Sequence, residues 1–370
     1  MTRMQVALLT AGDPDRVTGG YLFHRRLADR APAHGAQLSF VSVPELPLPW
    51  SMASGPAWLR ARALRVAEVV VLDSIAAAPA APWLGGVNAL IVGMLHQPPG
   101  GIEGAPAARA VRARFDLWAY RRADSLMVAS DWLAQQLVAA GVPASRLIVV
   151  PPGKDPAKAA EVSEEGLPGA RAELRGGRRS AALCVANWLP RKGIIELLEA
   201  VARLPPELVT LHLVGDTSVG GRYAGRVAAR IAQPDLGERV VVHGIVSAEE
   251  VGRLYRTADF FVLPSFEEPY GTVWGEAMAA GLPVIGWQAG NLPFLADHRR
   301  EALLVPVGDV AALSSAVDEV VRDEALRLRL GQAAALRAES RPTWDETAAR
   351  FFAVIDAARA HRRGPAPAAG

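Results

Sequence analysis

Short apolar runs alternate with helix-like stretches along the whole chain. In the first half the runs cover residues 5–10, 37–43, 66–72, 89–95, 126–129 and 147–150. They are nearly continuous and rich in β-branched residues, which is typical of parallel strands buried on both faces of a sheet. The alternation of such strands with helices predicts a doubly wound α/β domain.

A second series of the same kind follows, with runs at 181–186, 211–214, 240–242, 260–263, 284–286 and 303–305. Within it, Ser247 and Glu250 form a capping-box pattern that opens an amphipathic helix. Between the two series, from 151 to 180, Pro, Gly, Glu and Arg dominate, and we interpret this segment as the connection between domains. We therefore expect Rossmann-like domains at 1–165 and 166–342, a C-terminal crossover helix at 343–361 and a flexible tail at 362–370.

Composition excludes several classes of protein. The 370 residues, 51% hydrophobic and 21% charged, are enough for two domains that each bury a core. Cys184 is the single cysteine, so no intramolecular disulfide is possible, and no Cys/His cluster has zinc spacing. Forty basic and 38 acidic residues are too balanced to require a nucleic-acid partner. No apolar run has the length of a membrane span or of a signal-peptide core, so we expect a cytoplasmic protein.

In open α/β sheets ligands bind at the carboxyl ends of the strands, so we expect binding residues in the loops that follow the strands. The first loop ends in Thr18-Gly19-Gly20 before a helix, where backbone N–H groups can approach an anion, although such a pair is as often a simple turn. A GxGxxG fingerprint is missing, which argues against a dehydrogenase. Asp13 and Asp15 imitate an Asp-x-Asp metal motif, but in a polar loop they are more often solvated, and we predict no metal.

The loop after the first strand of the second series is cationic. It runs from Asn187 to Gly193 and contains Arg191 and Lys192 just before a helix. Adjacent cations at such a junction suit a diphosphate, although an isolated pair is usually a solvated surface feature. Lys192 is also the only lysine outside the 151–180 connection in a chain that otherwise uses arginine, which favours a requirement for a compact ammonium group.

Two carboxylates follow the strand at 260–263. Glu268 lies in the loop and Glu276 one turn inside the next helix, with the N–H groups of Gly271 to Val273 between them. Carboxylates accept hydrogen bonds from vicinal hydroxyls, and free N–H groups bind phosphate, so the site fits a sugar nucleotide. The same pair could be the acid and base of a glycosidase, but a hydrolase needs no cations and glycines for phosphate.

Taken together, these elements resemble glycosyltransferase family 4. The resemblance rests on Glu268-x7-Glu276 with Gly281-x-Pro283, on Arg191-Lys192-Gly193, on Gly19-Gly20, on Ala123-Asp124 to Ser130 and on Val149-Val150-Pro151-Pro152-Gly153-x-Asp155. It extends over nearly the whole chain, to about Ile355. It implies an α/β GT-B fold, in which two Rossmann-like domains face each other across a cleft and the C-terminal helix packs back toward the N-terminal domain. It also implies sugar transfer from a nucleotide donor with retention, without a metal or other cofactor.

The resemblance assigns roles to the donor-side residues. Glu268 would hold the hydroxyls of the donor sugar, Glu276 would accept hydrogen bonds from the ribose, and Arg191 and Lys192 would neutralise the diphosphate. His96, after the run at 89–95, matches the family's N-domain histidine near the reaction centre, although a histidine there is by itself more often a structural hydrogen bonder. The remaining positions implied in donor binding are Gly19, Gly20, Asn187, Gly244, Ile245, Val246, Tyr270, Gly271, Thr272 and Val273, of which Gly244 to Val246 would lie by the nucleobase.

Three places depart from the family pattern. Ala186-Asn187 replaces the common Gly-Arg, so Arg191 would have to supply the missing cation. Pro269-Tyr270 replaces the common Gly-Phe, and Trp274-Gly275 replaces aliphatic residues before Glu276. These departures leave the identity of the donor open.

We interpret the chain as a retaining hexosyltransferase that transfers a hexosyl group from a UDP- or GDP-sugar to an acceptor hydroxyl. The leaving phosphate would act as the base in a front-face attack, so no protein nucleophile is needed. The alternatives are a GT-B-like sugar-nucleotide epimerase or hydrolase, and a non-catalytic relative that binds nucleotide sugars. The acceptor is a lipid, a saccharide or a small metabolite. Basic stretches around Trp58 and from Arg109 to Arg122 could touch the inner face of a membrane, although a solvated helix face is the commoner explanation.

Overall fold

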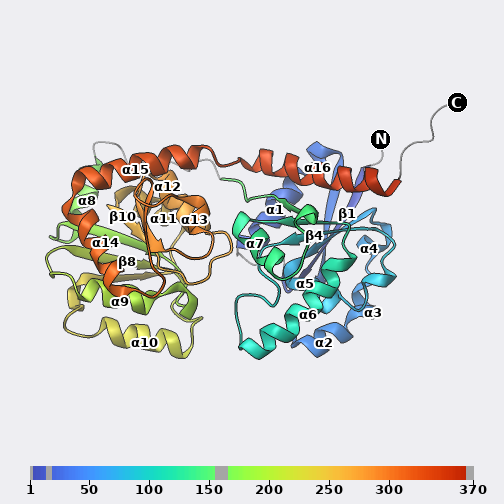
Figure 1. The fold of residues 1–370 in the computed structure, drawn as a ribbon, viewed down its shortest axis with the longest axis horizontal. Coiled ribbons are helices and arrows are strands. Elements are labelled where there is room, and N and C mark those ends of the chain that lie inside the picture. Colours follow the sequence, from blue (N-terminus) through green and yellow to red (C-terminus); the bar gives the residue numbers. More distant parts are fainter. Residues whose placement is uncertain (1–2, 14–18, 155–165, 364–370) are drawn as a thin grey trace. The chain divides into compact units, whose positions relative to one another are not determined.

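The structure is a computed structural model that describes residues 3–13, 19–154 and 166–363. The chain divides into two compact units; in Figure 1 the first is blue to green with the red helix α16, and the second runs from green through yellow to orange-red. The first unit contains the residues up to Lys154 and those from Pro342 onward, and the second runs from Asp155 to Arg341. The chain therefore leaves the first unit after Lys154 and returns to it after Arg341. The predicted boundary at 165 falls at the end of a segment, 155–165, that lies outside the described residues.

A parallel six-stranded sheet forms the centre of the first unit, with the order β2-β1-β3-β4-β5-β6. The strands are β1 (Met4–Ala11), β2 (Ala36–Val43), β3 (Val69–Asp73), β4 (Leu90–Leu95), β5 (Ser125–Val128) and β6 (Leu147–Val149). Every residue of β3 and β4 is buried, as the continuous apolar runs predicted. The run at 66–72 begins too early, because Val66 ends a helix and is exposed.

Helices connect these strands. They are α1 (Gly19–Arg30), α2 (Leu48–Ala53), α3 (Gly55–Trp58), α4 (Arg62–Val66), α5 (Ser74–Ala80), α6 (Pro106–Arg122) and α7 (Asp131–Ala139), with 3-10 turns η1 (Ala31–His34), η2 (Leu84–Gly86) and η3 (Ala144–Arg146). The Asp73 and Ser130 side chains cap α5 and α7 by accepting from the backbone N–H groups of Ile75 and Leu133. Helices α5 and α7 thus start directly at the carboxyl ends of β3 and β5.

The C-terminal helix α16 (Trp344–Arg363) belongs to the first unit and packs on α1, β4 and β5. Phe351, Phe352 and Ile355 are buried in the same core cluster as Val6 and Val71. This packing confirms the predicted return of the C-terminal helix to the N-terminal domain. Because Arg362 and Arg363 are helical, the helix passes the predicted end at 361, and the rest of the predicted tail, 364–370, lies outside the described residues.

The second unit repeats the architecture with a parallel sheet of order β12-β11-β10-β7-β8-β9. The strands are β7 (Ser180–Val185), β8 (Val209–Val214), β9 (Val240–Gly244), β10 (Phe260–Val262), β11 (Val284–Trp287) and β12 (Ala302–Val305). The helices are α8 (Leu167–Arg175), α9 (Ile194–Ala202), α10 (Arg222–Ile231), α11 (Ala248–Thr257), α12 (Thr272–Ala279), α13 (Leu292–Leu295), α14 (Val310–Arg322) and α15 (Glu324–Glu339), with turns η5 (Pro190–Lys192) and η6 (Gly237–Arg239).

The predicted capping box at α11 is half formed. The Ser247 hydroxyl accepts from the Glu250 N–H at 3.2 Å, as predicted. The Glu250 carboxylate instead pairs with Arg253, one turn further along the helix, at 2.6 Å. A salt bridge to an i+3 arginine thus replaces the reciprocal bond to the backbone.

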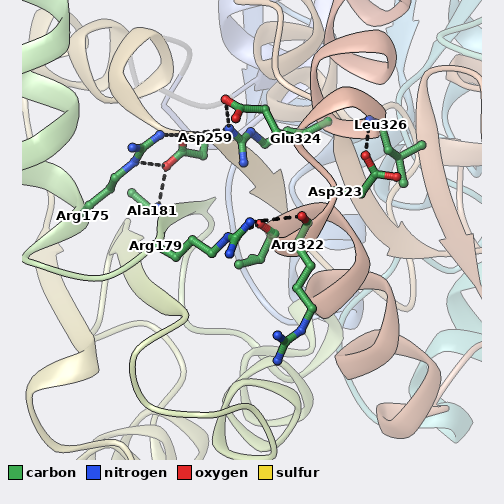
Figure 2. Close-up of polar contacts among 10 residues, drawn as sticks. Arg175, Arg179, Ala181, Asp259, Arg322, Asp323, Glu324 and Leu326 are labelled. Carbon is green, nitrogen blue, oxygen red and sulfur yellow. Dashed lines mark hydrogen bonds and ion pairs between the residues drawn. The ribbon is translucent and has the colours of Figure 1, made fainter.

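A buried carboxylate fastens the amino ends of the strands in the second unit (Figure 2). Asp259, just before β10, accepts from the Ala181 N–H at 2.8 Å and pairs with Arg175 of α8. Arg327 of α15 lies 4.0 Å from the same carboxylate. Nearby, Arg179 donates to the carbonyls at the end of α14, and Asp323 caps α15 through the Leu326 N–H. These contacts fix the sheet at its amino edge, which leaves the carboxyl edge for ligands.

Candidate active site

The predicted cations and the first predicted carboxylate meet at the carboxyl edge of the second sheet. Strands β7 and β10 are neighbours there, so the loop with η5 and the loop after β10 come together. The Lys192 ammonium donates to Glu268 Oε2, and Arg191 Nη1 lies 3.3 Å from the same oxygen. The side chains of Lys192 and Glu268 are only 11% and 15% exposed. A largely desolvated carboxylate is thus shared by two cations.

Backbone contacts hold these two loops in register. The Arg191 carbonyl accepts from the Phe266 N–H at 2.7 Å and from the Ser265 hydroxyl at 3.0 Å. Gly193 has φ +68°, and a Cβ there would lie 2.1 Å from the Pro264 carbonyl oxygen. Only glycine allows this approach, which explains why Gly193 follows the two cations.

Glu276 lies on the exposed side of α12 and is oriented by a residue that the sequence did not reveal. Tyr255 of α11 is buried, and its hydroxyl donates toward Glu276 Oε2 at 3.1 Å and lies 3.2 Å from the Val273 carbonyl. Burial, and then the Glu276 charge, raise the pKa of the Tyr255 phenol well above its usual range. Tyr255 therefore remains a hydrogen-bond donor at any physiological pH.

The N-terminus of α12 carries the predicted Gly271 to Val273 segment. Gly271 precedes the helix with φ +82° and offers no side-chain cap, so the first N–H groups of the helix are available to an anion. Thr272 is exposed and Val273 half-buried at this end. The helix begins at Thr272, as predicted, and the role of the segment in donor binding stays a prediction.

Asn291 is a second residue that sequence reasoning missed. It is buried; its N–H donates to the Glu268 carbonyl at 2.9 Å and its Nδ2 donates to the Tyr270 carbonyl at 2.9 Å. Before it, Gly290 leaves room for the Glu268 backbone, since a Cβ would lie 2.8 Å from the Glu268 carbonyl oxygen. The Gly-Asn pair after β11 is the sequence signal, but nothing in it points to residue 268.

The other predicted donor-side positions share this edge of the sheet without direct contact to Glu268. Asn187 follows β7 and accepts from the Asp216 N–H at 3.0 Å, so it shapes the loops after β7 and β8. Gly244 ends β9 with φ +68° and accepts from the Gly215 N–H at 2.9 Å. Ile245 is 77% exposed and Val246 half-buried. An exposed isoleucine beside the glycine that ends β9 offers an apolar surface for a flat ring.

In the first unit, His96 lies at the carboxyl end of β4, as predicted. Its Nε2 is 3.1 Å from Nε2 of His24, a fully buried residue of α1 that the sequence did not single out. Burial lowers the pKa of His24 to about 3 and that of His96 to about 4. Both imidazoles are therefore neutral at pH 7.

Behind the two histidines lies Asp73, at the carboxyl end of β3. Its Oδ2 accepts from the Thr10 hydroxyl at 2.7 Å and is 3.8 Å from His24 Nδ1. Burial raises the pKa of the Asp73 carboxyl. Because Asp73 also accepts from Ser74 and from the Ile75 N–H, its oxygens are occupied by hydrogen bonds.

Within the described ranges, His24, Asp73 and His96 are the one group whose ligand atoms lie near enough, within 4.8 Å, to hold a metal ion. An ion would have to displace the hydrogen bonds that Asp73 accepts. We interpret the trio as a hydrogen-bonded pair of histidines with Asp73 close to His24 but beyond hydrogen-bond distance of it, and the absence of a metal stays a prediction. Asp13 is exposed, and Asp15, its partner in the Asp-x-Asp pattern, lies outside the described residues.

The glycine pair of the first loop opens α1 beside His96. Gly19 and Gly20 are the first residues of this helix, and a Cβ on Gly20 would lie 4.0 Å from the His96 ring. A side chain at this position would therefore border the imidazole. Thr18 lies outside the described residues.

Comparison with known families assigns both units. Residues 2–153 match the model of the family described as "Glycosyl transferase 4-like domain", and residues 171–337 match the one described as "Glycosyl transferases group 1". The chain belongs to glycosyltransferase family 4. The two matches meet at the connection that the sequence predicted.

Two curated relatives have names that specify a glycosyltransferase activity. The chain is 31% identical over 218 residues to the D-inositol 3-phosphate glycosyltransferase of Corynebacterium jeikeium, an alignment that covers 57% of the chain and 52% of that relative. It is 28% identical over 270 residues to the GDP-mannose-dependent alpha-(1-6)-phosphatidylinositol monomannoside mannosyltransferase of Mycobacterium tuberculosis, covering 69% and 67%. The chain thus spans about half to two thirds of these relatives.

Solved structures of other proteins share the fold. Sucrose-phosphate synthase from Thermosynechococcus elongatus has a TM-score of 0.83 at 22% identity, covering 96% of this chain and 99% of that one. Anabaena Alr3699/HepE in complex with UDP-glucose has a TM-score of 0.77 at 20% identity, covering 95% and 99%. The predicted GT-B fold is confirmed. Among the described residues, every helix is too short or too polar to cross a membrane.

Proposed function

We propose that this family 4 chain transfers a hexosyl group from a UDP- or GDP-sugar to an acceptor hydroxyl, with retention and without a metal. The observation that carries the proposal is the shared contact of Arg191 and Lys192 with Glu268 at the carboxyl edge of the second sheet. The cations suit a diphosphate and the carboxylate suits sugar hydroxyls, which are the two chemically distinct parts of a nucleotide sugar.

Donor binding would exchange partners within this cluster. Without a donor, Glu268 contacts both cations and balances only one of their two positive charges. An arriving diphosphate competes for them, because phosphate oxygens accept strong charge-assisted hydrogen bonds from Arg and Lys. Glu268 is then able to turn its oxygens toward the hydroxyls of the sugar. The same cations stabilise the charge that grows on the leaving diphosphate, a type of contribution that is typically worth about 10²- to 10³-fold in rate.

Glu276 and Tyr255 would recognise the ribose. The Tyr255 hydroxyl fixes one oxygen of Glu276, so the carboxylate is oriented before a ligand arrives. Two vicinal hydroxyls can donate to one carboxylate, which favours a ribose over a deoxyribose. Ile245 and the Gly244 turn would contact the nucleobase.

His96 would serve as a neutral hydrogen-bonding group near the reacting carbon, and the departing phosphate oxygen would take the proton of the acceptor. The low pKa of the His96 imidazole supports this uncharged role. The hydrogen bonds that already occupy Asp73 support a reaction without a metal.

The curated relatives suggest which substrates to try first. Both names quoted above contain inositol, and one contains GDP-mannose. We therefore propose inositol-bearing hydroxyl acceptors, free or lipid-linked, ahead of other saccharides and metabolites. A contact with the inner face of an anionic membrane would favour a lipid-linked acceptor.

The structure changes the residues that such a membrane contact would use. Trp58, predicted at the contact, is 4% exposed and belongs to the core, whereas Trp50 is 69% exposed. On α6, Arg112 points to the Ile75 carbonyl, while Arg114, Arg121 and Arg122 are exposed. Sedimentation with anionic vesicles at low salt tests this contact, and its absence there would remove it.

Donor binding is the decisive experiment. The melting temperature should rise with UDP-glucose, UDP-N-acetylglucosamine or GDP-mannose, because a ligand bound by the native state alone stabilises it. The rise should vanish in Glu276→Ala and persist in Glu249→Ala, which removes an exposed carboxylate from α11. It should also persist in EDTA. A wild-type protein that responds to no nucleotide sugar or free nucleoside diphosphate would contradict the proposal.

The alternatives give different products. An epimerase or hydrolase would convert the donor alone to an isomerised or free sugar at the rate seen with acceptor present. A transferase consumes the donor mainly when an acceptor is added. A non-catalytic relative binds the donor and converts none of it.

A further inference from the structure

Arg341 contacts the side chain of Tyr270, which lies in the segment between Glu268 and the start of α12. Its guanidinium carbon lies 5.5 Å from the centre of the Tyr270 ring, and its Nη2 donates to the Tyr270 hydroxyl at 2.7 Å. Both side chains are half-buried. A stacked cation and a hydrogen bond from the same side chain fix the position of the ring.

Gly275 makes room for this contact. A Cβ at this position of α12 would lie 1.7 Å from Arg341 Nη1 and 2.4 Å from its guanidinium carbon. Gly275 is helical without a positive φ, so the backbone itself does not require glycine. The guanidinium also keeps its Nε buried without a hydrogen-bond partner among the described residues, a cost that would be avoided if Arg341 pointed into solvent. Gly275, Tyr270 and Arg341 therefore act as one unit.

Tyr270 is well placed to pass this constraint to the proposed donor site. It stands two residues after Glu268 and directly before Gly271. Asn291 holds its carbonyl and the Glu268 backbone, so the main chain is fixed from one side and the side chain from the other. Tyr270 and Gly275 are also among the positions at which the sequence departs from the family pattern.

Arg341 is the last residue of the second unit, at the point where the chain returns to the first. The next residue, Pro342, accepts from the Lys154 N–H at 2.8 Å, so the two places where the chain changes units lie side by side. The side chain of Arg341 thus connects the donor segment to a chain crossing.

We propose that Arg341 is a positioning residue that holds the 268–273 segment for the nucleotide sugar through Tyr270, in a space provided by Gly275. The identity of the ligand rests on the proposed function. The positioning of the 268–273 segment by Arg341 can be measured without a ligand.

Gly275→Ala separates positioning from stability. The added methyl group displaces the guanidinium, which is the mobile end of a long side chain, while alanine strengthens the helix. We expect an unchanged or higher melting temperature together with donor binding about tenfold weaker, comparable to that of Arg341→Ala. The double variant should bind no more weakly than either single variant, because both remove the same contact. Tyr270→Phe, which keeps the ring, should lose less.

Arg337→Ala is the matched control, since it removes an exposed arginine from the last turn of α15, just before Arg341 in the sequence. Calorimetric titration uses whichever of UDP-glucose or GDP-mannose stabilises the wild type. If that ligand binds Gly275→Ala and Arg341→Ala as tightly as the wild type, the inference is overturned. Equal weakening by Arg337→Ala would also overturn it, because the effect would then be one of net charge.

Amide hydrogen exchange of residues 268–273 provides the ligand-free readout. Exchange should be faster in Arg341→Ala and Gly275→Ala than in the wild type and Arg337→Ala. If the wild type binds no nucleotide sugar, the proposed function fails, and this comparison still decides the positioning. Unchanged exchange in both variants would overturn it.

Discussion

At the scale of single residues, the candidate site combines groups whose charges are arranged before any ligand arrives. Glu268 faces Lys192 and Arg191, Glu276 faces a buried tyrosine, and His96 faces a second neutral histidine. Each pair fixes one side chain through another, which reduces the reorganisation needed when a donor binds. The expected effects of substitution therefore depend on which partner is left behind.

Lys192→Ala removes the cation that contacts Glu268 most closely. We expect kcat for sugar transfer to fall about 10²- to 10³-fold, because the developing negative charge on the leaving diphosphate loses a preorganised donor. Arg226→Ala, an exposed arginine of α10, should leave kcat unchanged. Near-normal turnover of Lys192→Ala would show that Lys192 does not stabilise the leaving group.

His24 should make the protein sensitive to acid. Its pKa is about 3 in the folded chain against 6.5 when exposed, so the unfolded chain binds more protons between these values and stability falls as pH drops through this window. Asp73, whose pKa is raised, opposes this trend. In denaturant titrations at pH 7.0 and 5.5, His24→Gln should lose about 1 kcal/mol less on acidification than the wild type.

The control for this measurement is His361→Gln, because His361 is exposed at the end of α16. It should show the same acid sensitivity as the wild type. An equal loss in His24→Gln and wild type would mean that His24 is already protonated in the folded protein at pH 5.5.

At the scale of elements, the site is built by loops between strands and helices whose glycines allow close approach. The loop with η5 and the loop after β10 are joined by backbone hydrogen bonds to the Arg191 carbonyl. Gly193 permits that contact through its positive φ and its missing side chain. The arrangement of Arg191 and Lys192 thus depends on a neighbour that carries no charge.

Gly193→Ala should destabilise the second unit by about 1–3 kcal/mol, because alanine resists the left-handed conformation and its Cβ would meet the Pro264 carbonyl. Gly225→Ala is the matched comparison, since that glycine lies inside α10 with open space around it. It should stabilise by up to about 1 kcal/mol. Chemical denaturation of both variants measures the difference, and equal effects would contradict the role assigned to Gly193.

At the scale of the whole molecule, the chain ends by completing the unit in which it began. Helix α16 covers the first sheet with aromatic and aliphatic side chains, although the second unit lies between it and β6 in the sequence. The first unit can therefore reach its native core only after residue 341 has been passed. The two chain crossings after Lys154 and Arg341 follow from this connectivity.

Phe351→Ala should destabilise the first unit by about 3–5 kcal/mol, the usual cost of deleting a fully buried aromatic ring. Hydrogen exchange should rise in β4 and β5 and remain unchanged in β7 and β10, because the ring belongs to the core of the first unit. Arg362→Ala, at an exposed position of the same helix, should change neither. Faster exchange in β10 of Phe351→Ala would show that the two units unfold together.

The sequence alone determined the elements, the fold class and most residues of the candidate site. Apolar runs mark buried parallel strands because such strands need apolar residues on both faces. Four residues of the site could be found because each lies in the loop or at the start of the helix that follows a strand, and parallel sheets bring such positions to one edge. They are Arg191, Lys192, Glu268 and Glu276. Their local sequence therefore contained the information about their location.

The tertiary structure decided which side chains contact one another. His24 meets His96, Tyr255 meets Glu276 and Arg341 meets Tyr270 across 72, 21 and 71 residues of chain. These contacts depend on the order of strands and on helix packing, which no local pattern encodes. Exposure was decided in the same way: Trp58 is buried and Trp50 exposed, because α2 and α3 are too short for a periodic pattern to show which face meets the core.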